Sequence, residues 1–168
     1  EMSSFISLNI SVITVSDTRT EDTDKSGAVL VERLLGAGHK LHSKNIVKDD
    51  VYQLRAEVSA LIASSSVQAI LLTGGTGFTE RDNTVKAIEP LLDIPIEGFG
   101  ELFRQLSYQE IGSSTIQSRA FAGLVNGSIV FCVPGSPGAC VTAWDKIIME
   151  QLDNRHKPCN FVEKLRLA

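Results

Sequence analysis

The sequence predicts an α/β protein whose largely parallel sheet lies between helices, and three observations lead to this prediction. Three apolar segments rich in β-branched residues have the character of buried strands, at residues 8–17, 67–73 and 128–134. Segments with helical spacing of apolar residues separate them, and such alternation indicates parallel crossover units. A length of 168 residues is common for one hydrophobic core, so we expect a single domain over residues 1–168.

The first part of the chain alternates strand and helix in order. Residues 8–17 form the first predicted strand. A helix follows within residues 24–40, where Gly36 and Gly38 end it. Residues 40–49 alternate between apolar and polar side chains and predict a second strand.

The next helix carries its own start signal. Residues 49–65 place apolar side chains on one helical face, and Asp50 with Gln53 resembles a capping box at its beginning. The third strand, residues 67–73, then leads into a loop rich in glycine. This order of elements favours a crossover connection between the strands on either side of the helix.

The second part of the chain is interpreted from the same signals. We expect a strand at residues 128–134, and helices at residues 82–92, 101–112, 114–127 and 139–152. Pro90 stops the first of these helices, and Asn126-Gly127 forms a turn before the strand.

Composition excludes several classes of function. The formal net charge is −4, so there is no basic field to bind DNA or RNA, whereas a small phosphorylated ligand needs only local donors. Three cysteines without metal-type spacing argue against a disulfide framework and indicate a reducing, cytoplasmic setting. We find no signal peptide and no apolar run long enough to cross a membrane, so we expect no membrane partner.

Unusual loops follow three of the predicted strands. They read "VSDTRT" at residues 15–20, "TGGTGFTERD" at residues 73–82 and "VPGSPGA" at residues 133–139. If these strands are parallel, the loops share one edge of the sheet, where the ligands of open α/β sheets bind. We therefore expect the functional site at this edge.

The glycine-rich loop matches neither standard nucleotide motif. It lacks the lysine of a Walker loop, and Glu80 stands where a dinucleotide fingerprint needs its third glycine. Its glycines permit left-handed backbone angles and expose N–H groups, and its threonines offer hydroxyls to phosphate oxygens. The candidate phosphate-binding residues are Thr73, Gly74, Gly75, Thr76 and Gly77. The alternative is a tight turn between strand and helix.

The loop before the last helix offers a second candidate for anion binding. Gly135 and Ser136 present backbone N–H groups and a hydroxyl where the helix dipole favours an anion. The alternative is that Ser136 is a plain N-cap, with Pro137 at the first helical position.

Asp49 and Asp82 each allow two interpretations. Either carboxylate can cap a helix. Two carboxylates near a phosphate-binding loop can instead hold Mg²⁺, which prefers oxygen ligands and substrate phosphates. Spacing alone does not choose between these roles.

Several other polar residues carry weaker signals. His39 and His42 lie in a polar stretch without other metal ligands, so we expect solvated side chains. We expect Cys140 to be a small core residue, because no histidine is placed to act as its base. Candidate partners for anions, or plain surface charges, are Arg19, Arg81, Arg104 and Arg119.

Three longer motifs follow one another along the chain: "TGGTGFTERDNT", "EGFGELFRQLSYQEIGSSTIQSRAFAG" and "FCVPGSPGACVTAWDKII". Together they resemble the MoaB/MogA family of molybdenum cofactor biosynthesis, over a stretch from about Ser11 to Phe161. The segments "SRAFAG" and "KPCNF" are closer to the MoaB branch, molybdenum cofactor biosynthesis protein B, than to the MogA branch.

This resemblance implies a three-layer α/β/α sandwich with a mostly parallel mixed sheet, assembling as a homotrimer or homohexamer. It also implies work with other proteins of the molybdenum cofactor pathway. In the better understood branch, ATP and Mg²⁺ adenylylate molybdopterin, giving adenylyl-molybdopterin and pyrophosphate. Such a reaction needs positioning and charge neutralisation more than a protein nucleophile.

The resemblance also assigns roles to single residues. It implies that the loop of residues 74–77 cradles a nucleotide or pterin phosphate, and that Asp49 and Asp82 are the catalytic pair that manages Mg²⁺. Further implied positions are Ser16 and Asp17 at the nucleotide edge, Ser136 at the pterin phosphate, and Glu101 and Ser118 as motif positions.

The chain departs from the family pattern at two places. Residues 82–86 read "DNTVK" where adenylyltransferases commonly read Asp-Val-Thr-Pro-acidic. Gly138 stands where many members have a lysine, and the loss of that cation removes a possible phosphate contact. Two functions therefore stay open: adenylyl transfer to molybdopterin, and binding of molybdopterin and nucleotide with little or no turnover.

Overall fold

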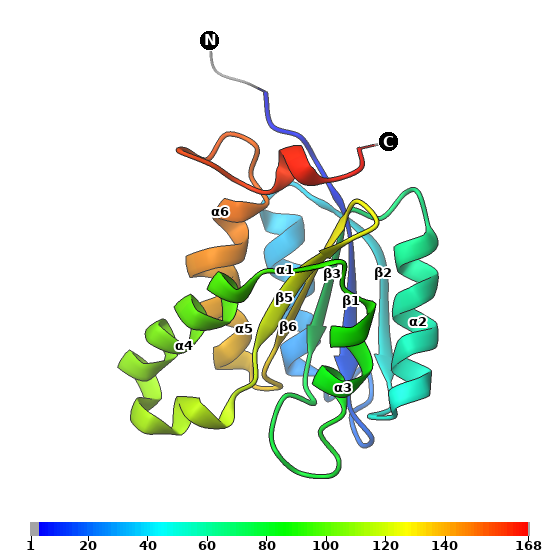
Figure 1. The fold of residues 1–168 in the computed structure, drawn as a ribbon, viewed down its shortest axis with the longest axis vertical. Helices are drawn as coiled ribbons and strands as arrows, with labels where there is room; N and C mark the ends of the chain where they lie inside the picture. Colours follow the sequence, from blue (N-terminus) through cyan, green and yellow to red (C-terminus); the bar gives the residue numbers. More distant parts are fainter. Residues whose placement is uncertain (1–3, 168) are drawn as a thin grey trace.

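A computed structural model describes residues 4–167, which form one mixed sheet with helices on both faces (Figure 1). The strands are β1 (Asn9–Val15), β2 (Lys40–Val47), β3 (Ala69–Thr73), β4 (Ile94–Pro95), β5 (Phe121–Val125) and β6 (Ser128–Val133). Their order across the sheet is β2-β1-β3-β6-β5-β4. The first four in this order are parallel, and β5 and β4 each run antiparallel to the preceding strand. The predicted α/β class with a mostly parallel mixed sheet is confirmed.

The helices lie within or close to the predicted ranges, except that the helix expected at residues 101–112 begins earlier, at Glu97. They are α1 (Lys25–Gly36), α2 (Val51–Ala63), α3 (Thr84–Ile88), α4 (Glu97–Ile111), α5 (Pro137–Ala143) and α6 (Met149–Gln151). A π-helical turn, Trp144–Ile148, joins α5 to α6 within the predicted last helix. Asp50 caps α2 by accepting hydrogen bonds from the N–H groups of Tyr52 and Gln53. None of the helices within residues 4–167 combines the length and apolarity that crossing a membrane requires.

The two faces of the sheet bury separate hydrophobic clusters. One cluster packs α1, α4 and α5 against side chains such as Ile10 and Val12 of β1. The other packs α2 and α3 against Ile13 and Val15 of the same strand. Alternate residues of a strand point to opposite faces, so a strand covered on both sides is apolar throughout. This double burial explains why the central strands could be predicted from short apolar runs.

One predicted element is wrong. Residues 114–127 were expected to be helical, but they form the end of a 3₁₀ turn (Gly112–Gln117) and then strand β5. Gly123 of β5 lies against Leu92, where an added Cβ would come within 2.6 Å of that side chain. The predicted turn at Asn126-Gly127 is present, with φ values of 48° and 76°, and joins β5 to β6 as a hairpin. The packing of Leu92 against this position requires a small residue, and the local sequence pattern does not contain this contact.

His39 lies in the core and not in solvent, contrary to expectation. Its side chain is only 4% exposed, and its Nδ1 accepts a hydrogen bond from the N–H of Leu8 at 3.1 Å. The ring packs between Phe5 and Trp144, with centroid distances of 5.1 and 6.3 Å. Burial lowers the pKa of His39 to about 4, and the negative charge of Asp153 opposes this only in part. His39 is therefore neutral in the folded protein above that pH.

This burial predicts a loss of stability in mild acid. Between pH 6.5 and about 4 the unfolded chain binds a proton at His39 that the folded chain excludes, so the free energy of unfolding falls as pH decreases. The contribution reaches about 3 kcal/mol near pH 4. Denaturant unfolding of His39→Gln across this range should show a flatter pH dependence than the parent. The exposed His42 is the control, and a His42→Gln variant that flattened the curve equally would contradict the assignment.

Candidate functional site

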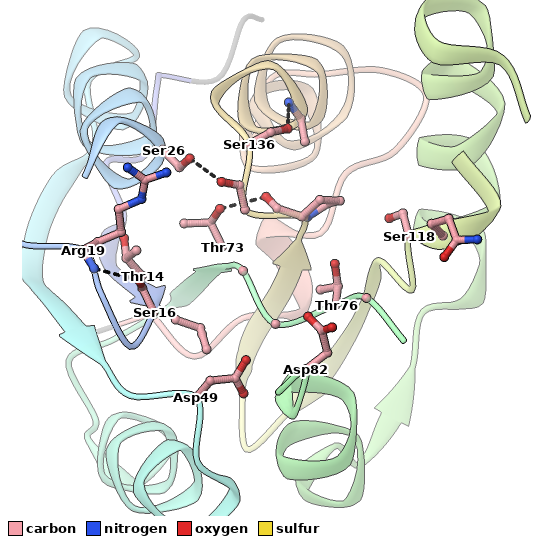
Figure 2. Close-up of a pocket in the computed structure, with 18 of the residues that line it drawn as sticks. Thr14, Ser16, Arg19, Ser26, Asp49, Thr73, Thr76, Asp82, Ser118 and Ser136 are labelled. Atoms are coloured by element: carbon pink, nitrogen blue, oxygen red, sulfur yellow. Dashed lines mark hydrogen bonds between the residues drawn. The ribbon is translucent and has the colours of Figure 1, made fainter. Parts of the chain in front are cut away.

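The three loops expected at one edge of the sheet do converge there. A cavity of about 500 Å³ opens beyond the carboxyl ends of β1, β3 and β6 (Figure 2). Of the predicted site residues, those that line it are Ser16, Asp49, Thr73, Gly74, Gly75, Thr76, Gly77, Asp82, Ser118, Gly135 and Ser136. Asp17 and Glu101 do not line it. The arrangement is the strand-end crevice in which open α/β sheets bind their ligands.

The glycine loop adopts a backbone that only glycine accommodates well. Gly74 and Gly75 have φ values of +108° and +71°. A Cβ on Gly74 would overlap the carbonyl oxygen of Val15. Gly77 does not enter the left-handed region, contrary to expectation, but a Cβ there would lie 2.8 Å from a carboxylate oxygen of Asp82. The loop is thus a tight turn that also brings its backbone into the cavity wall.

The two threonines of the loop differ in the use of their hydroxyls. Thr73 is buried, donates to the carbonyl of Pro134 at 2.8 Å and accepts from the thiol of Cys140 at 3.2 Å. The hydroxyl of Thr76 forms no hydrogen bond within residues 4–167 and points into the cavity in Figure 2. Thr76 is therefore the better donor for a ligand, whereas Thr73 holds the loop to the end of β6.

Cys140 is a core residue, as expected. It is fully buried at the start of α5. Burial raises the pKa of its thiol to about 11, so the nucleophilic thiolate is not formed near neutral pH.

Asp49 and Asp82 lie on the same side of the cavity, next to the glycine loop (Figure 2). Asp49 accepts the backbone N–H of Asn83 at 2.8 Å through Oδ1, and its Oδ2 faces Gly75. Asp82 accepts the N–H and the hydroxyl of Thr79 through Oδ2, at 3.0 and 2.6 Å. Both carboxylates line the cavity, and neither caps a helix.

The two carboxylates have different electrostatic surroundings. Burial raises the pKa of Asp49, and the nearby charges of Asp82 and Asp17 add to this, outweighing its hydrogen bonds from Asn83. Burial acts in the same direction on Asp82. There, however, hydrogen bonds from Thr79 and the loop backbone, with the charge of Arg119, hold the pKa below its ordinary value.

Ser16 and Asp17 shape the first loop instead of completing the cavity together. The Ser16 hydroxyl accepts the N–H groups of Thr18 and Arg19, at 3.2 and 2.9 Å. Asp17 accepts the N–H of Asp49 at 3.1 Å and forms an ion pair with Arg81. That pairing with Arg81 lowers the pKa of Asp17. Asp17 is therefore outside the cavity because its side chain turns toward the neighbouring loops.

Ser136 caps α5 by accepting the N–H of Ala139 at 3.1 Å, so the N-cap interpretation is correct. The residue is exposed and lines the cavity, which leaves its O–H free to donate to a ligand. Gly135 is held by α1, because its carbonyl accepts a hydrogen bond from the hydroxyl of Ser26 at 2.8 Å. The loop is thus tied to α1 as well as to β6.

Ser118 and Glu101 have separate positions. Ser118 lines the cavity, and its buried hydroxyl has no hydrogen-bond partner within residues 4–167. Glu101 instead lines a second cavity, together with Glu89, Glu97 and Arg104. The structure does not bring Glu101 to the site, because the face of α4 that turns to the main cavity carries Phe103, Ser107 and Ile111.

Comparison with known proteins identifies the relatives of this chain. The profile of a family described as a probable molybdopterin binding domain matches residues 11–154. The chain is 52% identical to molybdenum cofactor biosynthesis protein B of Escherichia coli (strain K12) over 162 residues, 96% of this chain and 95% of that protein. The chain belongs to the MoaB/MogA family. This confirms the resemblance seen in the sequence, and with it a role in molybdenum cofactor biosynthesis with molybdopterin as the bound ligand.

Solved structures of the MoaB/MogA family agree with the fold. A crystal structure of molybdenum cofactor biosynthesis protein B matches with a TM-score of 0.86 at 47% identity, covering 89% of this chain and 94% of that one. The tungsten cofactor synthesizing protein MoaB from Pyrococcus furiosus matches with a TM-score of 0.77 at 37% identity, covering 86% and 92%.

The segment that departs from the family pattern still supports the site. The N–H of Asn83 holds Asp49, and the Asn83 side chain donates to the Asp49 carbonyl at 3.2 Å. The buried hydroxyl of Thr84 donates to the carbonyl of Gly74 at 2.7 Å. The segment "DNTVK" therefore holds Asp49 and the glycine loop in fixed positions relative to each other.

Sequence reasoning missed one support of the MoaB/MogA site and gave another a different role. Asp24 is buried in the cavity wall, where it accepts from Thr14 at 2.6 Å, from the N–H of Gly27 at 2.9 Å and from Lys44 at 2.5 Å. Its place directly before the residues of α1 is an N-cap signal that could have found it. Arg119, expected to be an anion partner or a plain surface charge, donates to the carbonyls of Gly77 and Asp82. It thus ties the middle and the end of the glycine loop to the segment before β5.

Proposed function

We propose that this chain binds molybdopterin and ATP in the strand-end cavity and transfers the adenylyl group of ATP to the terminal phosphate of molybdopterin. One observation carries the proposal. Two carboxylates, Asp49 and Asp82, line one cavity of about 500 Å³ beside a backbone loop that only glycine can form.

The reaction requires positioning of two phosphorylated molecules. An oxygen of the pterin phosphate forms a bond to the α-phosphorus of ATP, and the bond from that phosphorus to the bridging oxygen of the β-phosphate breaks as pyrophosphate leaves. The Thr76 hydroxyl, the Ser136 hydroxyl and the backbone of the glycine loop are donors suited to orient the two phosphates. No protein nucleophile is needed, which agrees with the protonated thiol of Cys140.

The two carboxylates fit a Mg²⁺ ion that arrives with the nucleotide. Within residues 4–167 no group of three or more His, Cys, Asp or Glu side chains could hold a metal by itself. Mg²⁺ is commonly bound by one or two carboxylates together with substrate phosphates, so Asp49 and Asp82 are sufficient. When bound there, the ion would neutralise charge on the phosphates.

A second candidate function is binding of molybdopterin and nucleotide with little or no turnover. It is favoured by Gly138, which stands at the start of α5 in place of the lysine of many relatives. Of the residues that line the cavity, Arg19 is the one with a permanent positive charge. A site with so few cations stabilises the negative charge of a transition state less well.

One assay separates the two functions. The protein is incubated with molybdopterin, ATP and Mg²⁺, and pyrophosphate and adenylyl-molybdopterin are quantified together. Stoichiometric formation of both products supports transfer. Retention of molybdopterin without either product contradicts transfer and leaves the binding function.

The missing lysine leads to a separate prediction. A Cβ on Gly138 meets no atom within 4 Å, so a long side chain fits at this position without rearrangement. Gly138→Lys should strengthen ATP binding about three- to tenfold at low salt, and the gain should shrink as salt screens the added charge. Gly138→Gln is the uncharged control. Equal effects of the two substitutions in equilibrium titrations would show that the charge has no part in binding.

A further inference from the structure

We propose that Arg19 forms a second phosphate subsite in this cavity, one that binds a phosphate group without Mg²⁺. The inference rests on the proposed function in taking phosphorylated molecules as the ligands of the cavity. In this subsite the guanidinium of Arg19 donates hydrogen bonds to the oxygens of a phosphate. Arg19 thus binds the ligand directly, which the carboxylates of Asp49 and Asp82 cannot do without a metal.

Charge is distributed unevenly around the cavity. Of the three carboxylates in its wall, Asp24 is neutralised by Lys44 at 2.5 Å. Asp49 and Asp82 form no ion pair within residues 4–167, so their side of the cavity repels an anion unless a metal is present. Arg19 lies across the cavity from them, beside α1 (Figure 2). A phosphate that carries no metal is therefore attracted to the Arg19 side.

The first loop holds the backbone of Arg19 in place. The N–H of Arg19 donates to the Ser16 hydroxyl at 2.9 Å. On the other side, the N–H of Thr20 donates to the Thr23 hydroxyl at 2.9 Å, and the N–H of Asp24 donates to the carbonyl of Thr20 at 2.9 Å. The backbone of Arg19 is thus held in place before a ligand binds, which lowers the part of the entropic cost that comes from ordering the loop.

The guanidinium of Arg19 is itself uncommitted. Its side chain makes one hydrogen bond within residues 4–167, a long one of 3.5 Å to the carbonyl of Thr23, and no ion pair. In Figure 2 the guanidinium lies on the α1 side of the cavity near Ser26, and Ser136 lies beyond Ser26. A guanidinium with free donors can form several hydrogen bonds to one phosphate.

The other candidate arginines use their charge elsewhere. Arg81 pairs with Asp17 outside the cavity. Arg104 donates to the carbonyls of Ser118 and Ala120, at 3.4 and 3.0 Å. Arg119 donates to backbone carbonyls of the glycine loop, as described above. Of the four, Arg19 alone combines a place in the cavity wall with free donors.

The test measures binding in the absence of metal. Isothermal titration calorimetry in EDTA and low salt compares the parent protein with Arg19→Gln, Arg19→Lys and Asp82→Asn. ATP and molybdopterin are titrated separately, because the phosphate could come from either molecule. Arg155→Gln is the matched control, since Arg155 pairs with Asp153 in the segment after α6, at the end of the sheet away from the cavity (Figure 1). Circular dichroism verifies that each variant is folded.

We expect Arg19→Gln to weaken metal-free binding of at least one of the two ligands about tenfold or more. Arg19→Lys should retain part of the affinity, and Arg155→Gln should retain all of it. Asp82→Asn should bind somewhat more tightly than the parent, because it removes a negative charge that repels a metal-free phosphate. The ligand whose affinity falls is the source of the phosphate. Unchanged binding by Arg19→Gln, an equal loss in Asp82→Asn, or no metal-free binding by the parent would each overturn the inference. The pyrophosphate assay with Mg²⁺ judges the proposed function independently, because it does not depend on metal-free affinity.

Discussion

Replacing Asp82 by asparagine is expected to lower the rate of adenylyl transfer at least about 100-fold. The substitution removes a negative charge from the metal side of the cavity and keeps the size of the side chain. Asparagine also retains an oxygen that can accept the two hydrogen bonds from Thr79, so the loop should keep its shape. Asp49→Asn should have an effect of similar size. Initial rates at several Mg²⁺ concentrations measure the loss, and part of it should be recovered as the Mg²⁺ concentration rises.

The neighbouring Asp50 provides a matched control for Asp49. Its carboxylate caps α2 and does not line the cavity, and asparagine is an equally good N-cap. Asp50→Asn should therefore keep the parent rate. Full activity in both Asp49→Asn and Asp82→Asn would remove the carboxylate pair from the reaction.

Replacing Gly74 by alanine is expected to destabilise the protein by about 4 kcal/mol. Alanine at a φ of +108° is strained whatever space surrounds it, and the added Cβ would also overlap the carbonyl of Val15. Either the end of β1 or the glycine loop must shift to accommodate it. Equilibrium unfolding in denaturant measures the loss of stability.

Gly36→Ala is the control for this substitution. Gly36 ends α1, and a Cβ there meets no atom within 4 Å. Alanine has the higher helix propensity, so this variant should be more stable than the parent by about 0.5 kcal/mol. A stability of Gly74→Ala close to that of the parent would mean that the loop is not held in the conformation described above.

The elements predicted best from the sequence are those whose pattern of apolar residues matches their burial in the folded protein. β1, β3 and β6 are buried on both faces, so their apolar runs are unambiguous. β5 was misassigned because its strand character depends on its pairing with β4 and β6 and on the packing of Leu92 against Gly123. That contact joins residues far apart in sequence, and no local pattern contains it. Strand β4 could not be predicted either, because it is only two residues long and is defined by its pairing with β5, which is distant in sequence.

The candidate site was predictable in its location but not in its internal connections. Parallel strands bring their loops to one edge, so the glycine loop with Asp82 could be placed beside the first loop and the Ser136 loop from the order of elements. The role of Asp49 followed from the family resemblance. The free donors of Arg19 and the ion pair of Asp17 could not be predicted from the sequence, because they depend on which neighbouring side chain each residue contacts. The exclusion of Glu101 depends on the rotation of α4, which the packing of Phe99 and Phe103 into the core determines.

Crystals soaked with Mn²⁺ and a non-hydrolysable ATP analogue offer the most direct test of the central claim, that Asp49 and Asp82 hold the metal of a bound nucleotide beside the glycine loop. Anomalous scattering locates Mn²⁺ without ambiguity. The account predicts a peak in contact with the carboxylates of Asp49 and Asp82, with phosphate density against residues 74–77. A peak at the second cavity, among Glu89, Glu97 and Glu101, with none between Asp49 and Asp82, would contradict it.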